Sequence, residues 1–154
     1  MIETLREVVP NLWVSDIESA AVVGEDFDIV IDCTGKGPTH GNPKVRTVSR
    51  RPSGSGSHAW TVEDLDWITK GTGYHLKAGH KVLIHCRRGV SRSATAAAAV
   101  LLKMGLAKNP KDAIRRTSFQ GSTPATACVG GLNKWWKELQ ASRQTKLLLK
   151  NRSR

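Results

Sequence analysis

The chain reads KVLIHCRRGVSRSAT from Lys81 to Thr95, and this stretch decides the fold. The part from Lys81 to Cys86 is a short apolar run, typical of a strand buried on both faces of a parallel sheet. The part from Ser93 to Met104 is rich in Ala and Leu and apolar nearly all round, which predicts a central buried helix. A loop that contains Gly89 joins the two. Strand, loop and helix in this order indicate an α/β fold.

The rest of the chain continues the alternation of strands and helices. Further short strands are expected at Leu12 to Val14, Asp28 to Cys33 and Val45 to Val48. Helices are expected from Asp16 to near Gly24, from the N-cap Thr61 toward Gly79, from Pro110 to Arg116 and from Pro124 to about Leu139. We therefore predict an α/β fold whose central, mainly parallel, twisted sheet of four to five strands is flanked by helices.

The length of 154 residues, 39% of them hydrophobic, supports a single core. We expect one domain over residues 1–140 and a basic tail over residues 141–154. The tail contains five basic residues and no acidic one: Arg143, Lys146, Lys150, Arg152 and Arg154. Because terminal charge runs are commonly disordered, a frayed and solvated tail is favoured over a basic extension of the last helix that would contact nucleic acid or a membrane surface.

The charge balance and the cysteines narrow the class of protein. Lys and Arg number 24 against 13 Asp and Glu, a net charge of +11 that favours polyanionic partners such as RNA or acidic lipid headgroups. Three cysteines without a CxxC motif predict neither a disulfide framework nor a metal site, and no cofactor motif is present. With no signal-peptide pattern and no apolar run near the ~20 residues that span a bilayer, we expect a reduced, cytoplasmic protein without a transmembrane segment.

The loop after Cys86 is suited to hold an anion. Backbone N–H groups of a Gly-containing loop at a helix N-terminus converge on one place, and the helix dipole adds to their attraction. The same field should favour the thiolate of Cys86, the nucleophilic form. Five residues separate Cys86 from Arg92, so the chain can curl once around a tetrahedral anion and return the guanidinium fork to it. Ser93 is placed to donate a hydrogen bond to the sulfur.

These residues define the expected site. We predict that Cys86, Arg92 and Ser93 are catalytic, and that Cys86 is the nucleophile. The phosphate-binding loop is predicted to consist of Arg87, Arg88, Gly89, Val90, Ser91 and Arg92. His85 is expected to support the loop by hydrogen bonding. No metal is required, since the guanidinium and the N–H donors supply the positive charge.

At these residues the chain resembles the cysteine-dependent protein phosphatases, and it looks most like their dual-specificity branch. The pattern HCxxGxxRS fits without a gap from His85 to Ser93. The resemblance extends from the stretch that begins at Val9 to the one that ends at Trp136, roughly nine-tenths of the chain. It implies a hydrolase that dephosphorylates phosphotyrosine and phosphoserine or phosphothreonine of protein substrates through a phosphocysteine intermediate.

The chain departs from this family at the general acid. Members usually carry an Asp about 30 residues before the Cys, on the loop that precedes the helix before the motif. Here that loop runs from Ser49 to Trp60 and contains no carboxylate. Asp64 and Asp66 are the nearest carboxylates, but the position of Asp64 in the first helical turn predicts a capping role. His58, on the correct loop, is the candidate acid, and a good leaving group would need none.

Other activities stay open. RNA 5′-triphosphatases of the same superfamily do not depend on that Asp, but they typically show Thr-His where this chain has Arg87-Arg88. Phosphoinositide phosphatases are a further possibility, since a basic residue within the loop could meet extra phosphates. A pseudophosphatase that binds phosphoproteins without turnover, or a basic RNA-binding module, would not need Cys86, Arg92 and Ser93 at working spacing.

Overall fold

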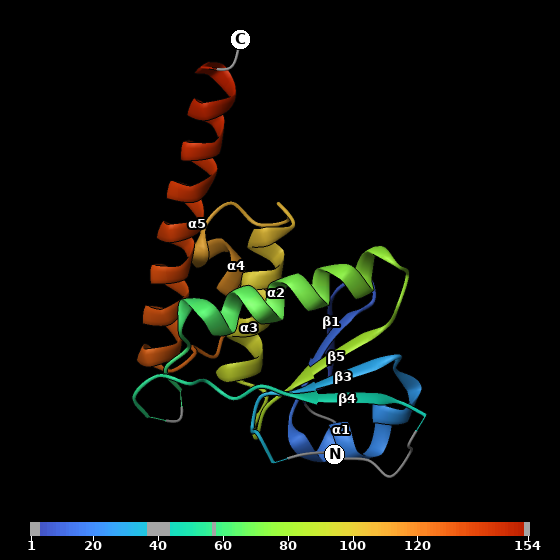
Figure 1. Ribbon diagram of the computed structural model, residues 1–154. Coiled ribbons are helices and arrows are strands. Elements are labelled where there is room, and N and C mark those ends of the chain that lie inside the picture. The colour runs from blue at the N-terminus through green and yellow to red at the C-terminus, as the bar shows by residue number, and fades with distance from the viewer. Residues whose placement is uncertain (1–3, 37–43, 57, 153–154) are drawn as a thin grey trace.

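The computed structural model describes residues 4–36, 44–56 and 58–152 (Figure 1). Its centre is a five-stranded sheet with the order β1-β2-β5-β3-β4. The strands are β1 (Arg6–Val9), β2 (Leu12–Ser15), β3 (Ile29–Asp32), β4 (Arg46–Ser49) and β5 (Val82–His85). β1 pairs with β2 in antiparallel orientation, and every other pair is parallel. The predicted mainly parallel sheet is confirmed, and the four expected strands lie where they were expected.

The strand β1 was not predicted. It contains the charged residues Arg6 and Glu7, and it lies at the edge of the sheet, paired only with β2. An edge strand lacks the long apolar run that marks a central strand, so its sequence signal is weak. By contrast, all residues of β3 and β5 are buried, as their apolar runs indicated.

The register of the parallel strands sets the position of the loop. His85, the last residue of β5, is opposite Ser15 on β2 and Asp32 on β3. The carboxyl ends of three neighbouring strands therefore coincide, and the chain leaves β5 at the middle of that edge. Ligands of open α/β sheets bind outside the carboxyl ends of the strands.

Helices cover both faces of the sheet (Figure 1). They are α1 (Ile17–Val23), the short 3-10 helix η1 (Gly24–Asp26), α2 (Val62–Lys77), α3 (Arg92–Lys103), α4 (Pro110–Thr117) and α5 (Thr126–Arg152). On the α1 face, Ala20 and Phe27 pack with Val30 and Leu83. The larger core lies on the other face, where α3, apolar as predicted, contributes a buried row from Ala96 to Leu102.

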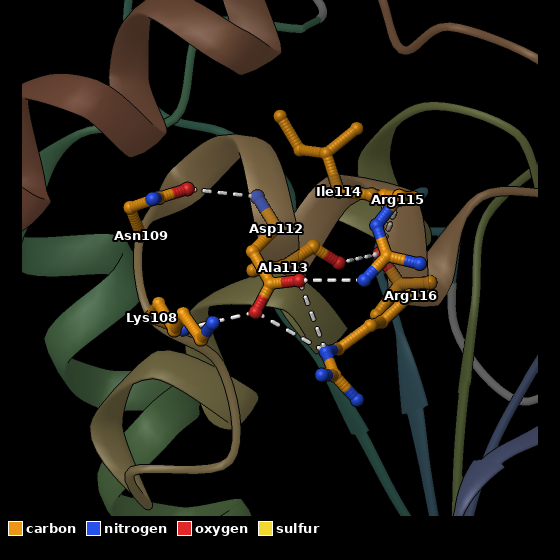
Figure 2. A network of polar contacts seen from close by, with 8 residues as sticks. Lys108, Asn109, Asp112, Ala113, Ile114, Arg115 and Arg116 are labelled. Atoms are coloured by element: carbon orange, nitrogen blue, oxygen red, sulfur yellow. Dashed lines mark hydrogen bonds and ion pairs between the residues drawn. The ribbon is translucent and has the colours of Figure 1, made fainter.

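The helix α4 begins with a polar network (Figure 2). Pro110 occupies the first turn, as its sequence position indicated, and Asn109 Oδ1 accepts a hydrogen bond of 2.9 Å from the backbone N–H of Asp112. The Asp112 carboxylate in turn accepts from the backbone N–H of Lys108 and from the side chains of Arg115 and Arg116. The Lys108 N–H first, and then the Arg115 side chain, lower the pKa of Asp112 to about 2. Both arginines of this helix thus have an anionic partner.

The last helix is longer than expected. α5 does not end near Leu139 but continues to Arg152, and its side chains are exposed from Gln140 onward. The expectation of a frayed tail is wrong for residues 141–152. This stretch contains neither Gly nor Pro and consists largely of good helix formers, so the helix propagates past its last core contacts. Among the residues that the structure describes, no helix has the length and apolarity needed to cross a membrane.

Candidate active site

The loop after β5 is held against the turn that joins β2 to α1. The backbone N–H of Cys86 donates to the carbonyl of Ser15 at 3.3 Å, and the N–H of Ile17 donates to the carbonyl of Arg87 at 3.2 Å. The loop therefore starts from a fixed position at the centre of the sheet edge. Its far end enters α3, whose first residue is Arg92.

Gly89 allows the loop to turn in this confined space. Its φ of +74° lies in the left-handed region, and a Cβ added there would be 2.7 Å from the carbonyl carbon of Ser15 and 2.8 Å from the backbone N of Asp16. No side chain fits between these backbone atoms. In this conformation the Gly89 N–H points at the Cys86 sulfur, with N and Sγ 3.2 Å apart. The predicted role of Gly89 in a tight turn thus has a structural basis.

The Cys86 sulfur has a second polar neighbour in Ser93. The Ser93 hydroxyl oxygen lies 3.1 Å from Sγ, and both side chains are buried, with 2% of Cys86 and none of Ser93 exposed. A hydroxyl and an amide N–H are donors that stabilise a sulfur anion. Cys86 nevertheless reaches a surface cleft of about 460 Å³, which we call the Cys86 cleft. Its other walls are Arg87, Arg88, Val90, Ser91, Arg92 and two residues from elsewhere, His58 and Ser122.

The other two cysteines differ from Cys86 in this respect. Cys33 and Cys128 are completely buried. Burial raises the pKa of the Cys33 thiol well above its usual value and the pKa of Cys128 to about 11. Both thiols are therefore held protonated and away from solvent, so Cys86 is the cysteine that a substrate can reach.

Arg92 lines the same cleft. Its backbone carbonyl accepts a hydrogen bond of 3.3 Å from the indole N–H of Trp60, which ties the start of α3 to the loop before α2. Its Nε is buried and has no hydrogen-bond partner in the part of the chain that the structure describes. A buried guanidinium N–H without an acceptor is costly. An oxyanion in the Cys86 cleft would supply that acceptor.

Two polar features below the loop were missed by the sequence reasoning. The first is Arg6 of β1, whose Nη2 donates to the carbonyls of Gly89 at 3.0 Å and Thr117 at 2.8 Å, while Nη1 donates to the carbonyl of Thr4 at 2.7 Å. Burial lowers the pKa of Arg6 to about 10, partly opposed by the nearby Cys86. Arg6 thus places a positive charge beneath the loop and holds the Gly89 peptide in its orientation.

The second feature is a contact between the ends of β3 and β5. His85 Nε2 lies 3.8 Å from Asp32 Oδ1, and neither side chain is exposed. Asp32 Oδ1 also accepts the backbone N–H of Thr34 at 2.8 Å. His85 was expected to support the loop, and its contact with Asp32 holds the residue that precedes Cys86. The sequence shows no local signal for this pairing, because it depends on the strand order.

The loop between β4 and α2 brings His58 to the site. His58 lines the Cys86 cleft, so its position is compatible with a role as general acid. Burial lowers the pKa of His58 below its ordinary value, and the positive charge of Arg92 lowers it further. The imidazole is therefore mostly neutral at neutral pH before a substrate binds. A dianionic phosphate near the ring would favour the protonated form.

The nearest carboxylates have structural partners instead. Asp64 and Thr61 form a capping box at the start of α2, as the sequence indicated, and Asp64 also accepts from Arg50 Nε at 3.0 Å and from the backbone N–H of Ser53 at 2.8 Å. Burial alone would raise the pKa of Asp64, but the hydrogen bonds from Ser53 and Thr61 outweigh it and lower the pKa. Asp66 accepts the indole N–H of Trp135 at 2.8 Å. Neither carboxylate lines the Cys86 cleft.

The described residues contain no group of three or more His, Cys, Asp or Glu side chains that could hold a metal ion.

Comparison with solved structures finds the same fold in several proteins, among them a putative dual specificity phosphatase. A mouse putative dual specificity phosphatase, solved in complex with zinc tungstate, superposes with a TM-score of 0.78 at 17% identity, over 93% of this chain and 92% of that one. Human DUSP28 gives a TM-score of 0.75 at 18% identity, over 89% and 95% of the two chains. PTPMT1 in complex with PI(5)P gives 0.74 at 18% identity, over 90% and 98%.

The sequence comparisons add no closer relative. No protein-family model matches the chain, and no curated protein matches it significantly. At 17–20% identity the solved structures show a common fold. The activity of this chain has to be argued from its own residues.

Proposed function

We propose that this protein is a cysteine-dependent phosphatase that hydrolyses phosphomonoesters, among them phosphotyrosine and phosphoserine or phosphothreonine of proteins. The observation that carries the proposal is the environment of one sulfur atom. Cys86 Sγ reaches a surface cleft, is contacted by the Gly89 N–H and the Ser93 hydroxyl, and shares that cleft with Arg92, whose buried Nε has no acceptor among the described residues. Thiolate, amide donors and guanidinium together form a site for nucleophilic attack on a tetrahedral oxyanion.

In the first step the Cys86 thiolate attacks phosphorus in line with the leaving oxygen. The S–P bond forms as the P–O bond to the leaving group breaks. Arg92 and the loop amides hold the equatorial oxygens, where negative charge is spread in the transition state. The leaving oxygen takes its proton from the His58 imidazolium when His58 is protonated, or from water when the leaving group is good.

In the second step water hydrolyses the cysteinyl-phosphate. The new P–O bond forms as the S–P bond breaks, inorganic phosphate leaves and the thiolate is restored. The Ser93 hydroxyl, 3.1 Å from Sγ, donates a hydrogen bond to the departing sulfur and so makes it a better leaving group. Arg6 acts below the loop as a positioning residue, since it holds the Gly89 carbonyl away from the substrate.

The fold supports this proposal independently of the residues. The structures that superpose over about nine-tenths of the chain include a putative dual specificity phosphatase and Tk-PTP in its active form, and the first was solved with tungstate, a tetrahedral oxyanion like phosphate. The loop from Cys86 to Ser93 lies outside the carboxyl ends of the strands, the usual ligand position in this class of sheet.

The test is a rapid-quench assay with para-nitrophenyl phosphate. We expect a burst of para-nitrophenol equal to the enzyme concentration, followed by slower steady-state release as the cysteinyl-phosphate hydrolyses. Cys86→Ser should abolish the burst and the turnover, while Cys128→Ser, a matched change of a buried thiol, should keep both. If the Cys86→Ser protein turns over at the wild-type rate, or if phosphopeptide is bound by the wild type without release of phosphate, the proposed function is wrong.

A further inference from the structure

Three clefts share walls around Arg92. The first is the Cys86 cleft. A second cleft, of about 730 Å³ and here called the middle cleft, shares His58, Arg87, Arg88 and Arg92 with it. A third, of about 560 Å³ and here called the Arg51 cleft, shares Thr34, Lys36 and Arg92 with the middle one. The shared residues join the three into a groove that runs from Cys86 to the loop before α2.

The groove has far more positive charge than one phosphate needs. Five cationic side chains line it, and Glu18 is the one carboxylate among the lining residues: the cations are Lys36, Arg51, Arg87, Arg88 and Arg92. Within the described ranges, none of the five forms an ion pair. Arg115 and Arg116 are different, since they share the carboxylate of Asp112 (Figure 2). The part of the chain that the structure describes therefore supplies no anionic partner for the cations of the groove, and a bound anion would do so.

Arg51 is held in place by its neighbour Gly35. A Cβ added at Gly35 would be 3.1 Å from Arg51 Cδ and 3.3 Å from its Cβ and Cγ, and φ at Gly35 is +74°. The apolar stem of Arg51 thus lies against the bare backbone of Gly35, and any side chain there would displace it. Packing of the stem restricts the rotamers of the guanidinium, which lowers the entropy cost of binding an anion.

The wall of the Arg51 cleft is also fixed. The carboxylate of Asp64 accepts the backbone N–H of Ser53 and the hydroxyl of Ser53, which ties this loop to the start of α2. Gly54 donates its N–H to the carbonyl of Ala59 at 2.9 Å, and a Cβ at Gly54 would be 2.6 Å from that oxygen. The carboxylate at the start of α2 therefore shapes the second half of the groove.

We propose that the Arg51 cleft is a second phosphate subsite, formed by Lys36 and Arg51, and that the preferred substrate is a small polyol bisphosphate whose second phosphate binds there. The inference rests on the proposed phosphatase function for the phosphate that Cys86 attacks. Because Arg92 lines all three clefts, the same side chain borders both phosphate positions. Two phosphates carried by one small ring can therefore both bind beside Arg92.

The lining of the groove favours a polar carrier over a peptide. The described residues that line the three clefts include no Phe, Tyr or Trp, and their larger apolar side chains are Ile17, Pro52 and Val90. A phosphotyrosine ring or the side chains of a peptide would bury apolar surface, for which these walls offer little. Hydroxyl groups of a polyol can instead hydrogen-bond to Thr34, to Ser53 and to the exposed cations.

Binding tests the subsite apart from turnover. In a Cys86→Ser protein, calorimetry at near-physiological ionic strength would compare a myo-inositol bisphosphate with adjacent phosphates against the two monophosphates derived from it. We expect the bisphosphate to bind at least about tenfold more tightly, the effect of one or two charge-assisted hydrogen bonds at an exposed site. Adding Lys36→Met and Arg51→Met should abolish this preference. Adding Lys134→Met and Lys137→Met, which remove two exposed cations of α5 outside the groove, should leave it intact.

Turnover measurements test the polyol carrier and the phosphatase activity separately. We expect the wild type to hydrolyse the bisphosphate with a higher kcat/KM than either monophosphate, and Lys36→Met with Arg51→Met to remove this advantage mainly through KM. Equal binding of bisphosphate and monophosphates, or the same loss in both double variants, would overturn the subsite. Faster turnover of a doubly phosphorylated peptide than of the bisphosphate would overturn the polyol carrier. A protein that shows the binding preference but no burst with para-nitrophenyl phosphate would keep the subsite and refute the phosphatase.

Discussion

Gly89→Ala should destabilise the protein and impair catalysis, and the chain contains its own control for this change. Gly105, just after α3, has the same φ of +74°, but a Cβ there would meet nothing within 4 Å. A Cβ at position 89 would lie 2.7 and 2.8 Å from backbone atoms of Ser15 and Asp16. The two Gly→Ala variants therefore share the conformational cost and differ in the steric one.

The magnitudes follow from these two costs. A left-handed conformation costs a non-glycine residue about 1–2 kcal/mol, so Gly105→Ala should lower the free energy of unfolding by that amount. Overpacking against backbone adds about 1–3 kcal/mol, so the total for Gly89→Ala should reach about 2–5 kcal/mol. A shifted loop also moves the Gly89 N–H, now 3.2 Å from Cys86 Sγ. Loss of a hydrogen bond to a charged group should lower kcat/KM by about 10- to 100-fold.

Urea unfolding and the hydrolysis of para-nitrophenyl phosphate measure the two effects separately. Gly105→Ala should keep the wild-type kcat/KM although it is less stable. If Gly89→Ala unfolds with the same free energy as Gly105→Ala and retains full kcat/KM, then the close approach of the loop to the β2–α1 turn has no role in stability or catalysis.

Three further changes probe the other groups around the sulfur. Arg6→Met should lower the free energy of unfolding by about 2–3 kcal/mol and reduce kcat/KM, because buried carbonyls lose a charged donor; a variant with wild-type kcat/KM would show that Arg6 does not position the loop. Ser93→Ala should keep the burst but slow the steady state, so that phosphorylated Cys86 accumulates and is detected by intact mass, whereas an unchanged steady state would exclude Ser93 from the second step. His58→Ala should slow the hydrolysis of alkyl phosphates and spare aryl phosphates. The pKa of His58 is lowered, so its acid form exists in the free enzyme only at acidic pH. The ratio of the wild-type rate to the His58→Ala rate with an alkyl phosphate should therefore fall as pH rises through that lowered pKa. An equal loss of rate with alkyl and aryl phosphates at all pH values would remove His58 from the mechanism.

The local part of the site could be predicted from the sequence. Cys86, Arg92 and Ser93 lie within one strand-loop-helix unit, so their spacing is enough to place them together, and Thr61 could be assigned as an N-cap because a capping box is a local pattern. His58 could be placed near the site only through the resemblance, because it lies on the loop where the phosphatases that the sequence resembles carry their general acid. The structure puts it in the Cys86 cleft.

The remaining parts depend on contacts between distant segments. Arg6 and Gly89 are separated by 83 positions, and their hydrogen bond requires β1, an edge strand with no clear pattern. The contact of Asp32 with His85 requires β3 and β5 to be neighbours, which a sequence without its strand order does not indicate. The subsite residues Lys36 and Arg51 follow two different strands, and only the parallel pairing of those strands, β3 and β4, brings them to one cleft.

The unbroken course of α5 limits what its basic end can do for catalysis. The residue just before this helix, Ala125, donates its N–H to the Ser91 hydroxyl of the loop, and 27 residues at a rise of 1.5 Å put the other end about 40 Å from that contact (Figure 1). An anionic group bound by Lys146 or Lys150 would therefore lie about 30 Å or more along the helix from the loop that holds Cys86. Such an arm would change how often the enzyme meets substrate, through local concentration, and would leave the rate of the chemical steps untouched.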